Sequence, residues 1–425
     1  MSSPDALAAL RIPFVRSFAA GRTLAVIGAQ IVSVAVGWQL YERTGNAWSL
    51  GLVGVFELLP VLVLMLPAGN AADRFPRRNI AMFAHSLLGL ASLGLAYVSW
   101  SGQPTTHIYA LLLVVGAARA FSSPSVGTIL PQLLKPEQFA NANAWLSSTY
   151  ELASVTGPAI GGLLIAATGT ATVAFFAASL GQLAFVLLLT RVPSVAPPPV
   201  AGRRSAREVF AGLAFIRRQP VFLAAITLDL FAVLMGGAVA LLPIFAKDIL
   251  EVGPSGLGWL RAAPSTGALT MALITTRMRP WRRPGVALLW AVTGFGIAII
   301  GFGLSRNVAL SLVCLFLSGM FDSVSVVIRM TLEQMITPDA LRGRVSAINF
   351  VFIGFSNELG AFESGATAAL FGPVISVVGG GIGTLLVVLG VAWMWPQMRR
   401  LGPLHTLRPT GETEADAVAE VSGAT

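Results

Sequence analysis

Runs of predominantly apolar residues recur along the whole chain and are separated by short polar segments. A helix needs about 20 such residues to cross the hydrocarbon core of a membrane. Twelve runs reach that length, at residues 21–41, 49–69, 79–100, 108–130, 144–167, 171–190, 222–245, 255–276, 285–304, 308–328, 346–370 and 374–395. A transmembrane β-barrel would instead show alternating segments of about ten residues. The pattern therefore predicts an all-α polytopic membrane protein with twelve transmembrane helices.

Composition agrees with a chain whose solvent is mostly lipid. Of the 425 residues, 55% are hydrophobic and only 11% are charged, against roughly 25% charged residues in ordinary soluble domains. This excludes a cytoplasmic enzyme and a disordered scaffold. The single Cys314 and the three widely separated histidines offer neither a disulfide framework nor a set of metal ligands. We therefore expect no metal and no cofactor.

The lysines and arginines predict the orientation in the membrane. A net charge of +9 also suits a nucleic-acid partner, but the basic residues form no stripe and lie between the apolar runs. If the N-terminus is cytoplasmic, only Arg43, Lys247 and Arg306 of the 28 lysines and arginines fall in outer loops. Cytoplasmic loops are the ones enriched in these residues. We therefore expect both termini in the cytoplasm, no nucleic acid and no removable signal peptide.

One long polar connection divides the spans into six and six. It covers residues 191–221 and holds three consecutive prolines followed by Arg203 and Arg204, a composition typical of a linker. The predicted organisation is a cytoplasmic N-terminus (1–20), an N-terminal six-helix half (21–190), this linker, a C-terminal half (222–396) and a disordered cytoplasmic tail (397–425). Gln132 and Pro136 recur as Gln334 and Pro338 at the same spacing. This match predicts pseudo-symmetric halves, an arrangement used for alternating access around a midplane site.

The loop after the second span carries a recognisable motif. It reads Gly69-Asn70-Ala71-Ala72-Asp73-Arg74-Phe75-Pro76-Arg77-Arg78, and it resembles the signature of the major facilitator superfamily in both spelling and position. The family pattern often has glycine where Pro76 stands. The resemblance implies that these side chains form a gate in which Asp73 faces a helix N-terminus of the other half, where a carboxylate is stabilised. The alternative is a plain positively charged loop. The residues that the resemblance implies for the gate are Gly69, Asp73, Arg74, Arg77 and Arg78.

The fifth span carries a second motif, Gly157-Pro158-Ala159-Ile160-Gly161-Gly162. It is similar to the core of the antiporter signature found in that span of drug and proton antiporters. Ala144 and Ala153 stand where the longer pattern has glycine. The motif residues Gly157, Pro158, Gly161 and Gly162 therefore support antiport, and the alternative is a packing seam between helices.

Further stretches resemble one branch of the superfamily, the enterobactin-exporter and macrolide-efflux branch. They include residues 36–41 (Val-Gly-Trp-Gln-Leu-Tyr) and 342–345 (Arg-Gly-Arg-Val). The resemblance implies a monomeric, proton-coupled exporter of a siderophore or an amphipathic drug in the bacterial inner membrane. An importer or facilitator of a small metabolite on the same scaffold is the alternative. A membrane enzyme is excluded because the chain has no nucleotide-binding, zinc-protease or nucleophile motif.

Ionisable residues at bilayer depth are costly and usually mark a pathway. In the superfamily, spans one, four, seven and ten line the central cavity, which implies that Arg119, Asp229 and Asp322 face it. We hypothesise that Arg119 and Asp322 attract each other in one conformation; the alternative is that Asp322 pairs with Arg329 on its own helix. Gln30 stands where relatives of this branch often have an acid, so a proton must bind elsewhere. The candidate proton or substrate sites are Arg119, Asp322, Asp229, Glu57 and Glu151, with Glu358 and Glu363 as further carboxylates at depth. For Glu57 and Glu358 the alternative is a structural role, with hydrogen bonds between the halves.

Aromatic residues within the spans are candidates for contact with a bulky amphipathic substrate. The alternative is that they face lipid or packing seams. They are Phe56, Trp38, Phe231, Phe321 and Phe350.

Overall fold

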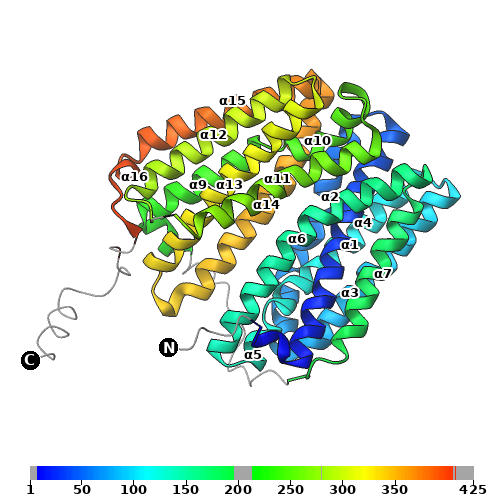
Figure 1. Ribbon diagram of the computed structural model, residues 1–425, viewed down its shortest axis with the longest axis horizontal. Helices are drawn as coiled ribbons and strands as arrows, with labels where there is room; N and C mark the ends of the chain where they lie inside the picture. Colours follow the sequence, from blue (N-terminus) through cyan, green and yellow to red (C-terminus); the bar gives the residue numbers. More distant parts are fainter. Residues whose placement is uncertain (1–6, 196–212, 279, 405–406, 408–425) are drawn as a thin grey trace, which may run out of the picture.

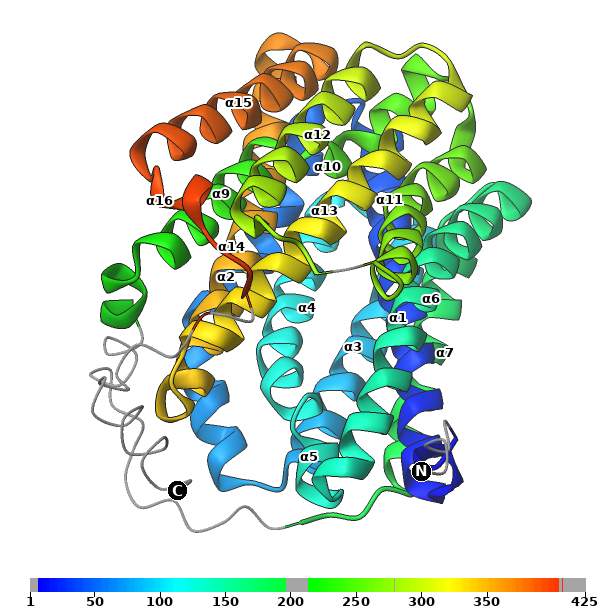
Figure 2. The ribbon, with the colours of Figure 1, turned by 60° about the vertical axis from the view of Figure 1, so that its left-hand side comes forward.

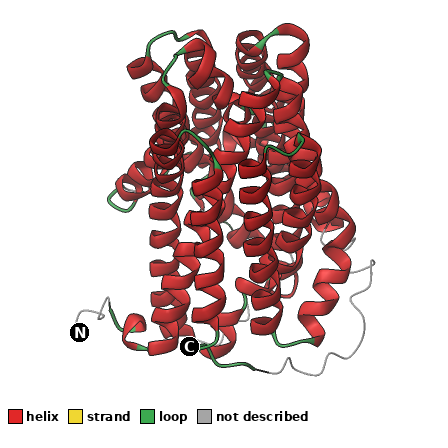
Figure 3. Cartoon of the chain, turned by 90° about the vertical axis from the view of Figure 1, so that its right-hand side faces the viewer, coloured by secondary structure: helices red, strands yellow, loops and turns green. Residues whose placement is uncertain are grey.

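The computed structural model describes residues 7–195, 213–278, 280–404 and 407. These residues are almost entirely helical and contain no β-strand (Figure 3). The prediction of an all-α fold is therefore confirmed. More than half of the predicted linker, including its three consecutive prolines, Arg203 and Arg204, lies outside the described residues, as does most of the predicted disordered tail. Those two predictions and the domain boundaries stay predictions.

The N-terminal half contains six long helices. Asn46 caps the second by accepting a hydrogen bond from the Trp48 backbone N–H at 2.9 Å, a typical N-cap contact. Glycines in the left-handed region end three others, for example Gly45 with φ 59°. The half begins with a short 3₁₀ turn, Ala9–Arg11, and its helices are α1 (Pro13–Thr44), α2 (Ala47–Arg74), α3 (Arg77–Ser101), α4 (Thr105–Val126), the short α5 (Ile129–Leu133), α6 (Pro136–Thr168) and α7 (Thr172–Leu189).

The C-terminal half repeats the plan with one helix broken. Its elements are α9 (Pro220–Met235), α10 (Ala238–Ile244), the π-helical turn η2 (Phe245–Ile249), α11 (Gly253–Thr275), α12 (Pro284–Leu304), α13 (Val308–Ile336), α14 (Asp339–Phe371), α15 (Pro373–Met394) and the short α16 (Gln397–Arg400). The predicted span 222–245 is therefore not one continuous helix. Gly236 and Gly237 break it, and a side chain at Gly237 would meet the Gly360 carbonyl at 2.6 Å.

Eleven of the described helical segments are long and apolar enough to cross a membrane. The remaining predicted span, 255–276, forms α11, a helix of 23 residues. Helix α11 is less apolar because it contains Arg261, Pro264 and several serine, threonine and glycine residues. It packs against α6 on one side and α13 on the other. Its polar residues therefore face protein more than lipid, which reduces the need for an apolar surface.

Helix packing has the two-fold pattern that the sequence predicted. In the first half α1 packs against α6 and α7, α2 against α4, and α3 against α4 and α7. In the second half α9 packs against α14 and α15, α11 against α13, and α12 against α13 and α15. Each packing pair of the first half therefore has a counterpart in the second half. The corresponding helices are, in order, α1, α2, α3, α4, α6 and α7 in the first half and α9, α11, α12, α13, α14 and α15 in the second. The largest contacts between the halves, α6 with α11 and α2 with α14, also exchange with each other.

Among the described residues, the two bundles share a hydrophobic core at one end only, and Figures 1 and 2 show their helices farther apart at the other end. The largest hydrophobic cluster mixes residues of both halves, such as Leu40 and Phe175 with Phe245 and Phe302. The two other clusters each draw on one half alone. We call the end with the shared core the closed end, where α1 meets α2, and the opposite end, where α2 meets α3, the open end. This conformation therefore holds its halves together at the closed end.

Candidate functional site

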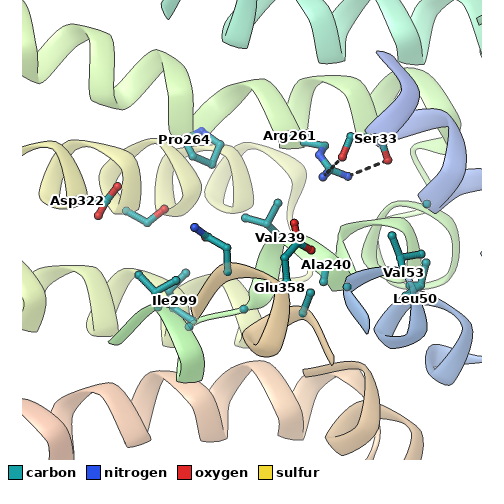
Figure 4. Close-up of a pocket in the computed structure, with 18 of the residues that line it drawn as sticks. Ser33, Leu50, Val53, Val239, Ala240, Arg261, Pro264, Ile299, Asp322 and Glu358 are labelled. Atoms are coloured by element: carbon teal, nitrogen blue, oxygen red, sulfur yellow. Dashed lines mark hydrogen bonds between the residues drawn. The ribbon is translucent and has the colours of Figure 1, made fainter. Parts of the chain in front are cut away.

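A cavity of about 360 Å³ lies between the halves (Figure 4). Both bundles line it: α1, α2 and α4 from the first, and α9 to α14 from the second. Small-molecule sites typically occupy about 300–1,000 Å³. The broken seventh span contributes Gly236 and Gly237 to the wall, in keeping with the use of discontinuous helices at transporter binding sites. The polar lining residues are Ser33, Glu57, Arg119, Arg261, Ser318, Asp322, Asn357 and Glu358.

Three charged side chains from both halves meet in the cavity wall. The Arg119 guanidinium of α4 donates to the Glu57 carboxylate of α2 in a close ion pair. Arg119 Nη1 also lies 3.7 Å from Glu358 Oε1 of α14, in the other half. Of the Arg119 side chain, 44% stays accessible, so this cation can exchange partners with water or ligand. We call Glu57, Arg119 and Glu358 the charge triad.

Glycines explain why the triad forms. A side chain at Gly116 would meet the Glu57 carbonyl oxygen at 2.3 Å, so α4 touches the α2 backbone there. A side chain at Gly54 would meet the Glu358 carbonyl oxygen at 2.3 Å, so α2 touches α14. Small residues let helix backbones approach closely within a membrane. The two close contacts bring the three charged groups to one level of the cavity.

Arg261 makes a second polar link between the halves. Its guanidinium donates to the Ser33 carbonyl oxygen at 3.2 Å and to Ser33 Oγ at 2.6 Å. Ser33 lies on α1 and Arg261 on α11, so this link also joins the two bundles. The sequence placed Arg261 within a span but did not single it out as a site.

Arg119 and Asp322 both line the cavity, as the sequence implied, but they do not pair in this conformation. Arg119 instead contacts Glu57 and Glu358. Arg329 pairs with Asp229 of α9 rather than with Asp322, and its Nε donates to Ser325 Oγ at 3.2 Å. The close approach of α2 and α4 places Glu57 nearer than Asp322. Asp229 lies in the α9–α13 ion pair and outside the cavity lining.

Replacing Arg329 by methionine is expected to destabilise the protein strongly. Arg329 and Asp229 are 8% and 10% exposed, and removal of one partner of a buried ion pair costs about 3–5 kcal/mol because the other charge stays buried and uncompensated. The double change Arg329→Met with Asp229→Leu is expected to restore most of the stability. Thermal unfolding in detergent measures both effects. Equal stability of the single and double variants would contradict this structural role.

Polar and aromatic contacts also join the halves at the closed end. The Tyr41 hydroxyl of α1 donates to the Asp248 carboxylate of η2, and the Lys247 ammonium lies 5.7 Å from the Tyr41 ring centroid. Trp48 of α2 and Phe362 of α14 pack with their ring centroids 5.7 Å apart. Asp248 and Lys247 lie in a π-helical turn, a feature frequent at functional sites. These contacts must separate if the closed end opens.

Replacing Tyr41 by phenylalanine is expected to open the closed end more often. The change removes the hydroxyl that binds Asp248 and keeps the ring beside Lys247. A hydrogen bond to a charged group contributes about 1.5–3 kcal/mol, so the ratio of closed to open molecules should fall by at least about tenfold. The measurement is the rate at which a polar maleimide supplied at the closed end labels a cysteine introduced at Val239, in a chain with Cys314 replaced by serine.

Tyr97→Phe provides the matched control because Tyr97 is 58% exposed on α3. Its labelling rate should equal that of the parent chain. A Tyr41→Phe variant that labels no faster than this control would show that the Tyr41–Asp248 contact does not hold the closed end.

The residues of the predicted gate lie at the open end. Asp73 and Arg74 form the last turn of α2, and Arg77 and Arg78 begin α3. Arg78 Nη1 donates to the Val192 carbonyl oxygen at 2.9 Å, which ties the start of α3 to the end of α7. A side chain at Gly69 would meet nothing within 4 Å, so no other helix approaches Gly69 closely in the part of the chain that the structure describes. The gating role stays a prediction.

The antiporter-like motif divides between two seams. A side chain at Gly157 would meet Gln30 Cβ at 2.6 Å, and one at Gly161 would meet Ile31 Cα at 3.2 Å, so both glycines face α1. A side chain at Gly162 would meet the Pro254 carbonyl oxygen at 2.4 Å on α11. Helix α11 in turn approaches the Pro158 carbonyl oxygen through Gly258. The motif therefore packs α6 against its own half and against the other half at once.

The remaining candidates lie apart from the cavity. Glu151 on α6 and Glu363 on α14 are absent from its described lining. Of the aromatic residues that the sequence suggested, Trp38 is buried in the shared core and Phe231 is 40% exposed, while nothing is described of the Phe350 side chain. Among the described residues, Phe295 is the aromatic residue that lines the cavity. Among the described residues no cluster of histidine, cysteine or acidic side chains has the arrangement of a metal site.

Two six-helix bundles around a central cavity, closed together at one end, define a multi-pass membrane transporter. Such a cavity reaches both aqueous compartments only if the halves change their relative tilt. The chain belongs to the major facilitator superfamily, whose family model matches residues 18–361. Family and fold thus place it among transporters and not among enzymes.

Comparison with curated proteins adds a more specific similarity. The chain is 28% identical over 389 residues to the enterobactin exporter EntS of Shigella boydii serotype 18, a match that covers 91% of this chain and 93% of that protein. The enterobactin exporter EntS of Escherichia coli strain SE11 matches with the same identity and coverage. The resemblance to the exporter branch is thereby confirmed.

Solved structures share the fold at low sequence identity. A bacterial homolog of the human lysosomal transporter Spinster, in an inward-facing and unoccupied conformation, superimposes with a TM-score of 0.70 at 15% identity and covers 94% of this chain and 98% of its own. The nucleoside transporter NupG gives a TM-score of 0.68 at 12% identity, with coverage of 91% and 99%. These likenesses concern the fold alone.

Proposed function

We propose that the protein exports a small organic molecule across the bacterial inner membrane in exchange for protons, acting as a monomer. The positive-inside rule supports an orientation with both termini in the cytoplasm. The open end then faces the cytoplasm and the closed end faces outward, so the conformation described here accepts substrate from inside the cell. The observation that carries the proposal is the charge triad, which links the two halves within the cavity.

The triad has the properties that proton coupling requires. Two carboxylates compete for one guanidinium, and one of them, Glu358, belongs to the opposite half. A proton on Glu358 removes its attraction to Arg119 and weakens a link that must break when the closed end opens. Return to the inward-facing state favours the charged form of Glu358 because Arg119 is again beside it. The available driving force is about 2.3 kcal/mol per charge per 100 mV.

The similarity to enterobactin exporters supports a siderophore as substrate, and the resemblance to macrolide efflux proteins supports an amphipathic drug. The cavity adds that the ligand contacts both charged and apolar groups. An importer or facilitator on the same scaffold is the second candidate, because the fold alone does not set the direction of transport.

Purified protein in liposomes with an imposed pH gradient tests the proposal. Siderophores, macrolides and cationic dyes are loaded into the lumen, and their efflux is followed with the exterior more acidic than the lumen. We expect faster efflux of at least one substrate class than without the gradient, and loss of this acceleration with a protonophore. An efflux rate that is the same with and without the pH gradient would instead indicate facilitated diffusion. Net uptake with the flow of protons would indicate an importer.

A further inference from the structure

Among the described residues, no carboxylate directly contacts the Arg261 guanidinium in the cavity. Arg261 uses two of its N–H groups on Ser33, a neutral residue, whereas a guanidinium carries five donors. Glu57 and Glu358 line the same cavity, and both lie beside Arg119 instead. In the part of the chain that the structure describes, no acidic side chain forms an ion pair with it.

The Asp322 carboxylate in the cavity also lacks a direct partner among the described residues. The Asp322 carboxylate of α13 lines the wall, and no described residue donates a hydrogen bond to it or forms an ion pair with it. Arg329, on the same helix as Asp322, is bonded to Asp229 instead. An ionised carboxylate accepts hydrogen bonds and donates none. Asp322 therefore needs a hydrogen-bond donor or a cation that enters the cavity.

The two groups lie at opposite sides of the same space. Figure 4 shows Arg261 with its hydrogen bonds to Ser33 on one side and Asp322 on the other, with Pro264 and Val239 between them. The cavity lining also includes Phe295, Ile299 and Leu315, which offer an apolar surface. A buried charge without a partner is costly, and a ligand that supplies the partner removes this cost.

We propose that the cavity selects a dipolar ligand, with an anionic oxygen group bound to Arg261, a cationic nitrogen group bound to Asp322 and an apolar body between them. The inference rests on the proposed function only in taking the cavity as the transport site. A ligand with only one charge pairs with either Arg261 or Asp322 and leaves the other residue without a partner. Selectivity therefore comes from the requirement for both charges at once, as expected when a site rejects analogues that leave its polar groups unpaired.

Three dyes with one aromatic skeleton test this requirement. Rhodamine 110 carries both a carboxylate and a cationic nitrogen system, rhodamine 123 is its methyl ester and keeps only the cation, and fluorescein is an anion. Fluorescence polarisation with the purified full-length protein measures binding without any gradient. We expect rhodamine 110 to bind at least about tenfold more tightly than either analogue, the factor that corresponds to one charge-assisted hydrogen bond.

The variants assign each charge to its side chain. Arg261→Gln is expected to abolish the preference for rhodamine 110 over rhodamine 123, and Asp322→Asn the preference over fluorescein. Arg261→Lys keeps the cation and should retain part of the first preference, which separates loss of charge from loss of folding. Arg306→Gln, in an exposed loop, should change neither preference. Equal affinity for the three dyes, including no binding of any of them, would overturn the proposal, as would preferences that survive both neutralising changes.

The dye-binding experiment gives a result that does not depend on whether transport is coupled to protons. A protein that shows these binding preferences but transports without regard to the pH gradient would refute the coupling and leave the dipolar site intact. A protein that transports with the gradient but binds the three dyes alike would refute the dipolar site alone.

Discussion

Gly365→Val is expected to remove most transport while leaving the protein folded. A side chain at Gly365 would meet Gly51 Cα at 2.4 Å and the Ala47 carbonyl oxygen at 3.1 Å. These are backbone atoms of α2 and cannot rotate away, so the seam between α2 and α14 at the closed end cannot form. Each half retains its own core at the open end. Overpacking costs about 1–3 kcal/mol. Because this cost falls only on the conformation with the closed end formed, the population of that conformation, and with it transport, should fall by roughly 10- to 100-fold.

The measurement for Gly365→Val is efflux from liposomes together with thermal unfolding. Gly390→Val is the matched control because Gly390 lies on α15 and a side chain there would meet nothing within 4 Å. We expect near-normal transport and a normal unfolding temperature from the control, and a lowering of the unfolding temperature by only a few degrees from Gly365→Val. Normal transport by Gly365→Val would mean that the seam does not have to close during the cycle.

The second large effect is expected from Glu358→Gln, which should abolish the response of transport to a pH gradient. Glutamine keeps the shape of the side chain but carries no charge and binds no proton. The link between Arg119 and the opposite half is then permanently weakened, while Glu57 still pairs with Arg119. We expect loss of transport against a concentration gradient and retention of downhill efflux. Efflux measured with and without an acidic exterior separates the two.

Glu363→Gln provides the control for Glu358→Gln on the same helix, since Glu363 is absent from the described lining of the cavity. Its transport should keep the full response to the pH gradient. A Glu358→Gln variant that still concentrates substrate, or a control that loses the response equally, would exclude Glu358 as the coupling residue.

Much of the fold follows from the sequence because apolar runs of membrane length have few alternatives to a helix. Eleven such helices and the less apolar α11 occupy the predicted spans, and the halves pack as repeats. The break at Gly236 and Gly237 was missed, since glycine is common within intact membrane helices. What distinguishes this pair is the close approach of α14 at Gly237, a tertiary contact that no local pattern encodes.

The sequence indicated which charged residues line the cavity better than it indicated which of them contact each other. The cost of charge in a membrane singled out Glu57, Arg119, Asp322 and Glu358, and all four line the cavity. Their partners depend on which helix faces turn toward each other, and the contacts at Gly54 and Gly116 decide that. Arg119 therefore binds Glu57 rather than Asp322. Arg261 was overlooked because its value as a site depends on Ser33, which lies in the other half of the chain.

The central claim is that the halves rock, so that the cavity reaches each side of the membrane in turn. Distances between paired spin labels test it directly. One pair joins the halves at the open end, at Asn70 on α2 and Arg344 on α14, and the other joins them at the closed end, at Glu42 on α1 and Leu370 on α14. Two distance populations are expected at each pair, and substrate or an acidic pH should shorten one distance as it lengthens the other. A single distance at both pairs, unchanged by substrate and by pH, would contradict the account.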